Sequence, residues 1–79
     1  MEVKVLGPGC TNCVKLENEV KDVLDELNIA ADVQKVTDMN QITEHGVMMT
    51  PALVVNGDVK VTGRMPRKDE IIKWIEEAE

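Results

Sequence analysis

The sequence has almost no aromatic residues: Trp74 is the only one, and Phe and Tyr do not occur. The chain therefore lacks the stacked aromatic surfaces on which proteins bind single-stranded nucleic acids. Its core has to be built from aliphatic side chains instead. Val and Ile together supply 17 residues, and these β-branched residues favour strands.

Long apolar runs and an excess of positive charge are missing too. No apolar run reaches the roughly 20 residues that a membrane-spanning helix requires. Fifteen acidic residues against nine basic ones give a formal net charge of −6. A chain this acidic repels phosphate backbones and anionic lipids, so we expect neither nucleic acid nor a membrane as a partner. The hydrophobic content of 43% is typical of a globular protein.

Only two cysteines are present, Cys10 and Cys13. A secreted domain of this size usually carries a framework of four or more cysteines. Met1–Lys4 leads directly into an apolar segment, without the pattern of a secretory signal. We therefore expect a cytoplasmic protein with one domain over residues 1–79. In the cytoplasm a close cysteine pair is typically catalytic or metal-binding rather than structural.

The hydrophobic pattern predicts strands and helices in the order βαβαββα, which is an α/β fold. A strand–helix–strand unit makes the first two strands parallel. Asn56-Gly57 is typical of a tight hairpin, which makes the last two strands antiparallel. The prediction is a mixed four-stranded sheet flanked by helices. The expected strands are Val3–Leu6, Asp32–Val36, Ala52–Val55 and Val59–Val61, and the expected helices are Thr11–Leu27, Met39–Glu44 and a last one between Pro66 and Glu77.

Several residues indicate where these elements end. Gly7-Pro8-Gly9 breaks the first strand, and Asn28 is a plausible stop for the first helix. Asp38 can cap the short second helix, which would end with Gly46 in a left-handed conformation. The last helix is expected to start with a poor cap, because Arg67 stands where Ser or Asp would serve better.

The two cysteines lie between the first strand and the first helix. Unpaired backbone N–H groups and the helix dipole at that point stabilise a thiolate, which lowers a thiol pKa from about 8.5 to about 7.5. Cys10 precedes the helix beside Gly9 and should be exposed. Cys13 shares a helical face with Leu16 and Val20 and should be buried. The spacing favours a redox pair with Cys10 as nucleophile and Cys13 as resolving thiol.

A soft-metal site is the alternative, because thiolates at this spacing also favour Cu(I) or Zn(II). Heavy-metal-associated domains and copper chaperones likewise begin with a strand, a Cys-x-x-Cys loop and a helix. They resemble βαββαβ and end on a strand, whereas this chain ends in a predicted helix. They also usually place Met two residues before the first cysteine, where this chain has Pro8.

Two motifs together carry a resemblance to a known family. Gly9-Cys10-Thr11-Asn12-Cys13 follows the first strand, and Thr50-Pro51-Ala52-Leu53-Val54-Val55-Asn56-Gly57 spans the third strand and its hairpin. The chain resembles the small thioredoxin-like and glutaredoxin-like redox-active disulfide proteins of archaea and bacteria over nearly its whole length. The resemblance implies a thioredoxin-like fold and thiol–disulfide oxidoreductase activity. It also implies that Pro51 is cis and packs against the disulfide, and that Gly63 matches a glycine that follows the fourth strand.

The resemblance also implies how substrates bind. Thr50 would offer backbone hydrogen bonds to an extended substrate segment, next to Pro51. Gly9, Thr11, Asn12 and Met49 are the further candidate substrate contacts. The implied partners are a disulfide-containing protein substrate and an upstream reductase; we expect a monomer without a cofactor or metal.

The chain differs from typical thioredoxins and glutaredoxins between the two cysteines. Thr11-Asn12 stands where thioredoxins usually have Gly-Pro and dithiol glutaredoxins Pro-Tyr. Neither thioredoxin partners nor the use of glutathione follow from the motif. No buried acid is evident to accept a proton from Cys13, and Asp38 is a weak candidate for that role.

Overall fold

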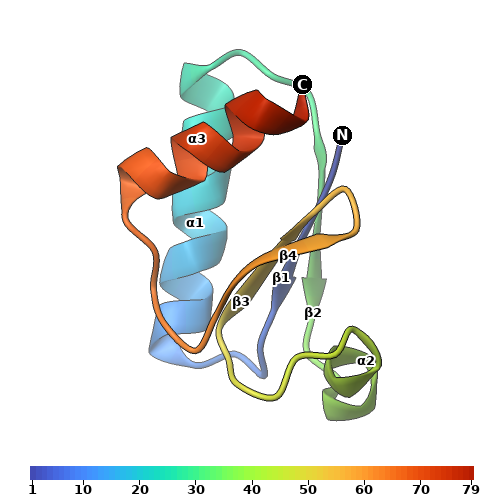
Figure 1. Cartoon of the computed structure of the whole chain (residues 1–79). Coiled ribbons are helices and arrows are strands. Elements are labelled where there is room, and N and C mark those ends of the chain that lie inside the picture. Colours follow the sequence, from blue (N-terminus) through green and yellow to red (C-terminus); the bar gives the residue numbers. More distant parts are fainter.

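The computed structural model describes residues 1–79 and contains seven elements in the predicted order (Figure 1). The sequence-based bounds differ from the observed ones only at the ends of elements. The elements are β1 (Glu2–Leu6), α1 (Thr11–Glu26), β2 (Asp32–Val36), α2 (Met39–Glu44), β3 (Ala52–Val55), β4 (Asp58–Thr62) and α3 (Lys68–Ala78).

The four strands form one mixed sheet in the order β2-β1-β3-β4. β1 and β2 are parallel, while β3 is antiparallel to both β1 and β4, so the predicted sheet is confirmed. Leu6 at the end of β1 lies opposite Ala52 at the start of β3. This register brings Gly7, which follows β1, next to Pro51, which precedes β3.

The helices cover the two faces of the sheet unequally (Figure 1). α1 and α3 pack on one face and α2 covers part of the other. No helix combines the length and the apolar character that crossing a bilayer requires. The larger cluster consists of Val3, Val5, Leu16, Val20, Val23, Leu24, Leu53, Val55, Val61, Ile71 and Ile75, and the smaller one of Leu6, Ile42, Val47, Ala52 and Val54.

The predicted element ends are confirmed, with one exception. Asn28 and Gly46 have φ of 55° and 78°, as left-handed helix ends require. The Asp38 carboxylate accepts hydrogen bonds from two backbone N–H groups of α2. The exception is the expected poor cap of α3. The Arg67 side chain makes no cap hydrogen bond, but the Glu70 carboxylate accepts from the Arg67 N–H at 3.0 Å. A side chain inside the helix therefore does what the cap residue cannot.

Candidate active site

Cys10 and Cys13 form a disulfide at the start of α1, with Cα atoms 5.0 Å apart. Cys10 is the residue that caps the helix, and its Sγ accepts a hydrogen bond from the Cys13 N–H at 3.2 Å. Gly9 has a φ of 101°, which is open to glycine and lets the chain turn from the loop into the helix. The sequence spacing thus brings both sulfurs together, as predicted.

The two cysteines differ in exposure. Cys10 is exposed, whereas Cys13 is 1% exposed and lies on the inner face of α1 with Leu16 and Val20. Thr11 and Asn12, between them, are exposed in the first turn of the helix, as is Gly9 before it. One sulfur is therefore accessible to a partner, and the other is covered by the fold.

Gly7 is buried directly against Cys13. A Cβ atom placed on Gly7 would overlap with the Cys13 Sγ, and it would lie 3.8 Å from the Thr50 Cβ. Gly7, Cys13 and Thr50 therefore meet at one point, and no larger residue fits at position 7. The sequence pattern marks Gly7 only as the end of a strand, so this contribution to the site is missed.

The segment before β3 completes the site. The Thr50–Pro51 peptide bond is cis, as the family resemblance implies. Pro51 is buried, Thr50 is half-buried and Met49 is exposed. Gly63 holds this segment in place, because its N–H donates a hydrogen bond to the Pro51 carbonyl at 2.9 Å.

Charged side chains are absent from the two segments that build the site. Residues 5–14 and 46–57 contain no Asp, Glu, Lys or Arg. The structure also has no buried polar or charged side chain, so no buried acid lies behind Cys13. Asp38, the weak candidate for that role, is exposed and instead caps α2. The two segments that carry the disulfide and the cis proline therefore bring no charge of their own, and the charged residue nearest to the cysteines along the chain is Lys15 in α1.

The order of elements separates this chain from the metal-binding alternative. No group of three or more His, Cys, Asp or Glu side chains is arranged to hold a metal ion. The chain ends on α3 and not on a strand, so its topology is not the βαββαβ order of copper chaperones.

Fold and site together define a thioredoxin-like thiol–disulfide oxidoreductase: an α/β sheet with a Cys-x-x-Cys disulfide where the first helix begins and a cis proline before β3. Comparison with known families agrees with this class. Residues 1–76 match the family described as thioredoxin domain, and the chain belongs to it.

Three archaeal relatives of this chain are each named thioredoxin. A protein named thioredoxin from Methanothermobacter thermautotrophicus is 40% identical over 73 residues, which cover 92% of this chain and 95% of the relative. Two proteins named thioredoxin from Methanocaldococcus jannaschii are 35% and 31% identical. Each alignment covers 87% of this chain, and they cover 79% and 84% of the respective relative.

Proposed function

We propose that the chain reduces disulfide bonds of protein substrates, with Cys10 as the nucleophile and Cys13 as the resolving thiol. The observation that carries this assignment is the difference between the two sulfurs. Cys10 is exposed at the tip of α1, whereas Cys13 is buried one turn deeper. Only Cys10 can meet a substrate sulfur without a rearrangement of the fold.

The reaction consists of two thiol–disulfide exchanges. The Cys10 thiolate attacks one sulfur of the substrate disulfide, which forms a mixed disulfide and releases the other substrate sulfur as a thiolate. The Cys13 thiolate then attacks the Cys10 Sγ. The second substrate sulfur leaves, and the Cys10–Cys13 disulfide remains. Two electrons pass from the dithiol to the substrate, which takes up two protons from solvent.

The start of α1 favours the thiolate form of Cys10. In the oxidised state its sulfur already accepts a hydrogen bond from the Cys13 N–H. The positive end of the helix dipole acts at the same place, and both effects lower the pKa of a thiol. Residues 5–14 and 46–57 carry no charged side chain, and we therefore assign this stabilisation mainly to the backbone.

Substrate binding is proposed at the surface around the disulfide. Thr50 and Pro51 would bind an extended substrate segment, with Met49 in apolar contact beside them. Gly9, Thr11 and Asn12 would contact the substrate on the side of α1. This proposal is supported by the exposure of Met49 and by the lack of charged side chains in both segments. An uncharged surface can approach many protein substrates without desolvating ions.

The proposed partners are a disulfide-containing protein and an upstream reductase that restores the dithiol with two electrons. We further propose that residues 1–79 act as one domain and as a monomer in the cytoplasm. The presence of only two cysteines, both in the active-site motif, supports that location, since cytoplasmic thiols are kept reduced.

Titration of thiolate absorbance tests the assignment of the nucleophile. In Cys13→Ser the remaining Cys10 thiol should titrate below the free-cysteine value of about 8.5. Cys13→Ser should also accumulate a mixed disulfide with a disulfide-containing peptide, visible by mass spectrometry. Cys10→Ser is the matched control and should form none, because its thiol is buried. A Cys10 pKa at or above that of free cysteine would contradict the proposal.

A further inference from the structure

The segment that joins β4 to α3 has few backbone contacts. Arg64, Met65 and Pro66 take part in no backbone–backbone hydrogen bond. Pro66 is buried and Met65 packs against the larger apolar cluster. Any further restraint on this segment has to come from side chains.

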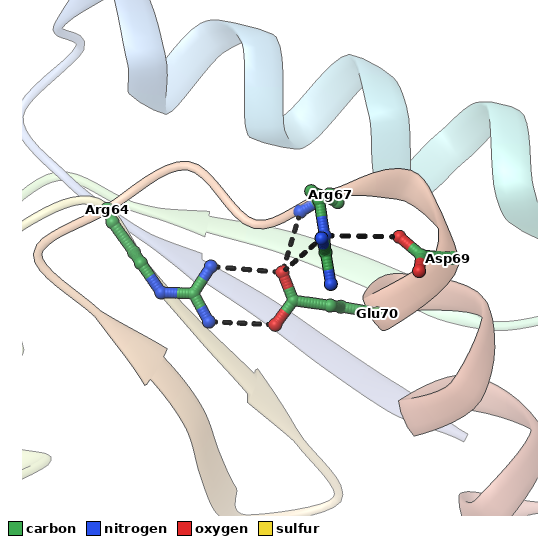
Figure 2. A network of polar contacts seen from close by, with 4 residues as sticks. All are labelled: Arg64, Arg67, Asp69 and Glu70. Carbon is green, nitrogen blue, oxygen red and sulfur yellow. Dashed lines mark hydrogen bonds and ion pairs between the residues drawn. The ribbon is translucent and has the colours of Figure 1, made fainter.

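Glu70 supplies that restraint (Figure 2). Its carboxylate accepts two hydrogen bonds from the Arg64 guanidinium, at 3.0 and 2.7 Å. One of its oxygens also accepts from the Arg67 N–H at 3.0 Å. A single side chain in the first turn of α3 therefore holds both ends of residues 64–67, and the paired bonds to Arg64 fix the direction of the guanidinium as well as its distance.

The electrostatics of this contact keep Glu70 ionised. The Arg64 hydrogen bond, followed by the Arg67 N–H, lowers the pKa of Glu70 to about 2. In turn the hydrogen bond that Arg64 donates to Glu70 raises the pKa of Arg64. The pair thus keeps both charges at every pH at which a thiol exchanges disulfides.

The held segment directly follows Gly63, which contacts the residues proposed to bind substrate. The Gly63 N–H donates to the Pro51 carbonyl at 2.9 Å. A Cβ on Gly63 would lie between 3.2 and 3.4 Å from three atoms of the Met49 side chain. Gly63 therefore touches the residues on both sides of Thr50.

From these contacts we infer that Glu70 and Arg64 are positioning residues for substrate binding. By fixing residues 64–67 they keep Gly63 against Pro51 and Met49, and so hold Thr50 in place for an extended substrate segment. This inference rests on the proposed function. Neither Glu70 nor Arg64 takes part in the exchange of electrons.

The test compares two carboxylates of the same helix. Glu70→Gln removes the charge that holds Arg64, whereas Glu77→Gln removes the charge of a weaker exposed pair, in which Lys73 Nζ lies 4.0 Å from Glu77 Oε1. Both variants have the same net charge. For a peptide with an internal disulfide, Glu70→Gln should raise KM about fivefold with little change in kcat, which corresponds to the loss of about one ordinary hydrogen bond to the substrate. Dithiodipyridine is a small neutral disulfide that has no peptide backbone to bind. Glu70→Gln should reduce it at the same rate as the unmodified protein does. Glu77→Gln should reduce both substrates with the kinetic constants of the unmodified protein.

A second measurement reads the contact itself. Hydrogen exchange at the Gly63 amide should become faster in Glu70→Gln, while amides of β1 and β3 keep their protection. Arg64→Gln should behave like Glu70→Gln, and Arg64→Lys, which keeps the charge, should show a smaller rise in KM than Arg64→Gln.

Two results would overturn the inference. One is the same KM for the peptide in Glu70→Gln and Glu77→Gln. The other is that Glu70→Gln slows the reduction of the peptide and of dithiodipyridine by the same factor. If the unmodified protein reduces neither substrate, the proposed function itself fails, and this outcome is distinct from the other two.

Discussion

Two glycines shape the active site for different reasons. Gly7 is needed for space, because its backbone lies against the Cys13 Sγ. Gly63 is needed for conformation as well, with a φ of 77° and the Met49 side chain beside it. At both positions a single methyl group would disturb residues of the site.

Gly7→Ala is expected to change both stability and redox behaviour. The added methyl overlaps with the Cys13 Sγ, so Cys13 or β1 has to move. Such overpacking typically costs about 1–3 kcal/mol of the free energy of unfolding. The oxidised protein should unfold at lower urea concentration, and a smaller fraction should be oxidised at equilibrium with dithiothreitol.

Gly46→Ala is the control for Gly7→Ala. Gly46 has a φ of 78° and no atom within 4 Å of an added Cβ, so only backbone strain is introduced there. It should lower stability without changing the fraction oxidised. If the fraction of oxidised protein were unchanged in Gly7→Ala, the contact between residue 7 and Cys13 would not be tight.

The residues of the active site differ in how well the sequence predicts their roles. Cys10, Cys13 and Thr50-Pro51 stand in motifs, and the structure joins the two cysteines in a disulfide and gives Thr50-Pro51 the expected cis bond. Gly7 stands in no motif of its own. Its role depends on how closely β1 and α1 pack, which is a contact in space that a strand-ending glycine does not reveal.

The ends of elements are held by side chains whose reach is mostly local. Asp38 acts on amides two and three residues away, and Asn56-Gly57 turns the chain within the hairpin. Such local patterns are predictable from the sequence. The cap of α3 is not, because the residue at the cap position, Arg67, is unsuitable and Glu70 acts from inside the helix.

Asn56→Ala should destabilise the hairpin and its attachment to the rest of the fold. Asn56 has a φ of 50°, which alanine adopts at a cost, and its side-chain oxygen accepts from the Glu2 N–H at 2.9 Å. Losing both is expected to lower the free energy of unfolding by about 1–3 kcal/mol. Asn56→Asp keeps an acceptor and tolerates this conformation, so it should lose less. Equal urea midpoints for the two variants would contradict this explanation.

Glu70 predicts a pH dependence of stability. Its pKa in the folded chain is lowered from 4.5 to about 2 by the hydrogen bond from Arg64. A lowered pKa of an acid stabilises the fold above the unfolded value, and this contribution is lost as the pH falls from about 5 towards 2. As the pH falls through this range, the free energy of unfolding should decrease more steeply in the unmodified protein than in Glu70→Gln.

Glu77→Gln is again the control, and its slope over this pH range should exceed that of Glu70→Gln. Identical slopes for the unmodified protein and Glu70→Gln would contradict the pKa assignment, because the slope counts the protons taken up on unfolding.

At the scale of the whole molecule, two aliphatic clusters on opposite faces of the sheet carry the fold. The order of elements follows from the hydrophobic pattern and the turn residues, and the sheet order then follows from the parallel and antiparallel pairings. The connection of these clusters to the site is indirect. Leu6 and Ala52 belong to the smaller cluster, and their chain neighbours are Gly7, which lies against the Cys13 Sγ, and Pro51, which has the cis bond.

Reduction of the disulfide should therefore leave the protein folded. The bond joins residues only three positions apart, and closing so short a loop removes chain entropy worth roughly 2 kcal/mol from the unfolded state. The reduced form recovers part of this difference, because the start of α1 stabilises the Cys10 thiolate. The reduced protein should unfold at a lower urea concentration than the oxidised one, by about 2 kcal/mol or less.

Trp74 reports this comparison directly, because it is the only aromatic residue and packs half-buried against the larger cluster. Its fluorescence should follow one cooperative transition in both redox states, and Cys10→Ser, which cannot form the disulfide, should also unfold below the midpoint of the oxidised protein. If the reduced chain were already unfolded without urea, the disulfide would hold the fold. The aliphatic clusters would then be too small to do so, and a protein of this kind could not cycle between its two redox states.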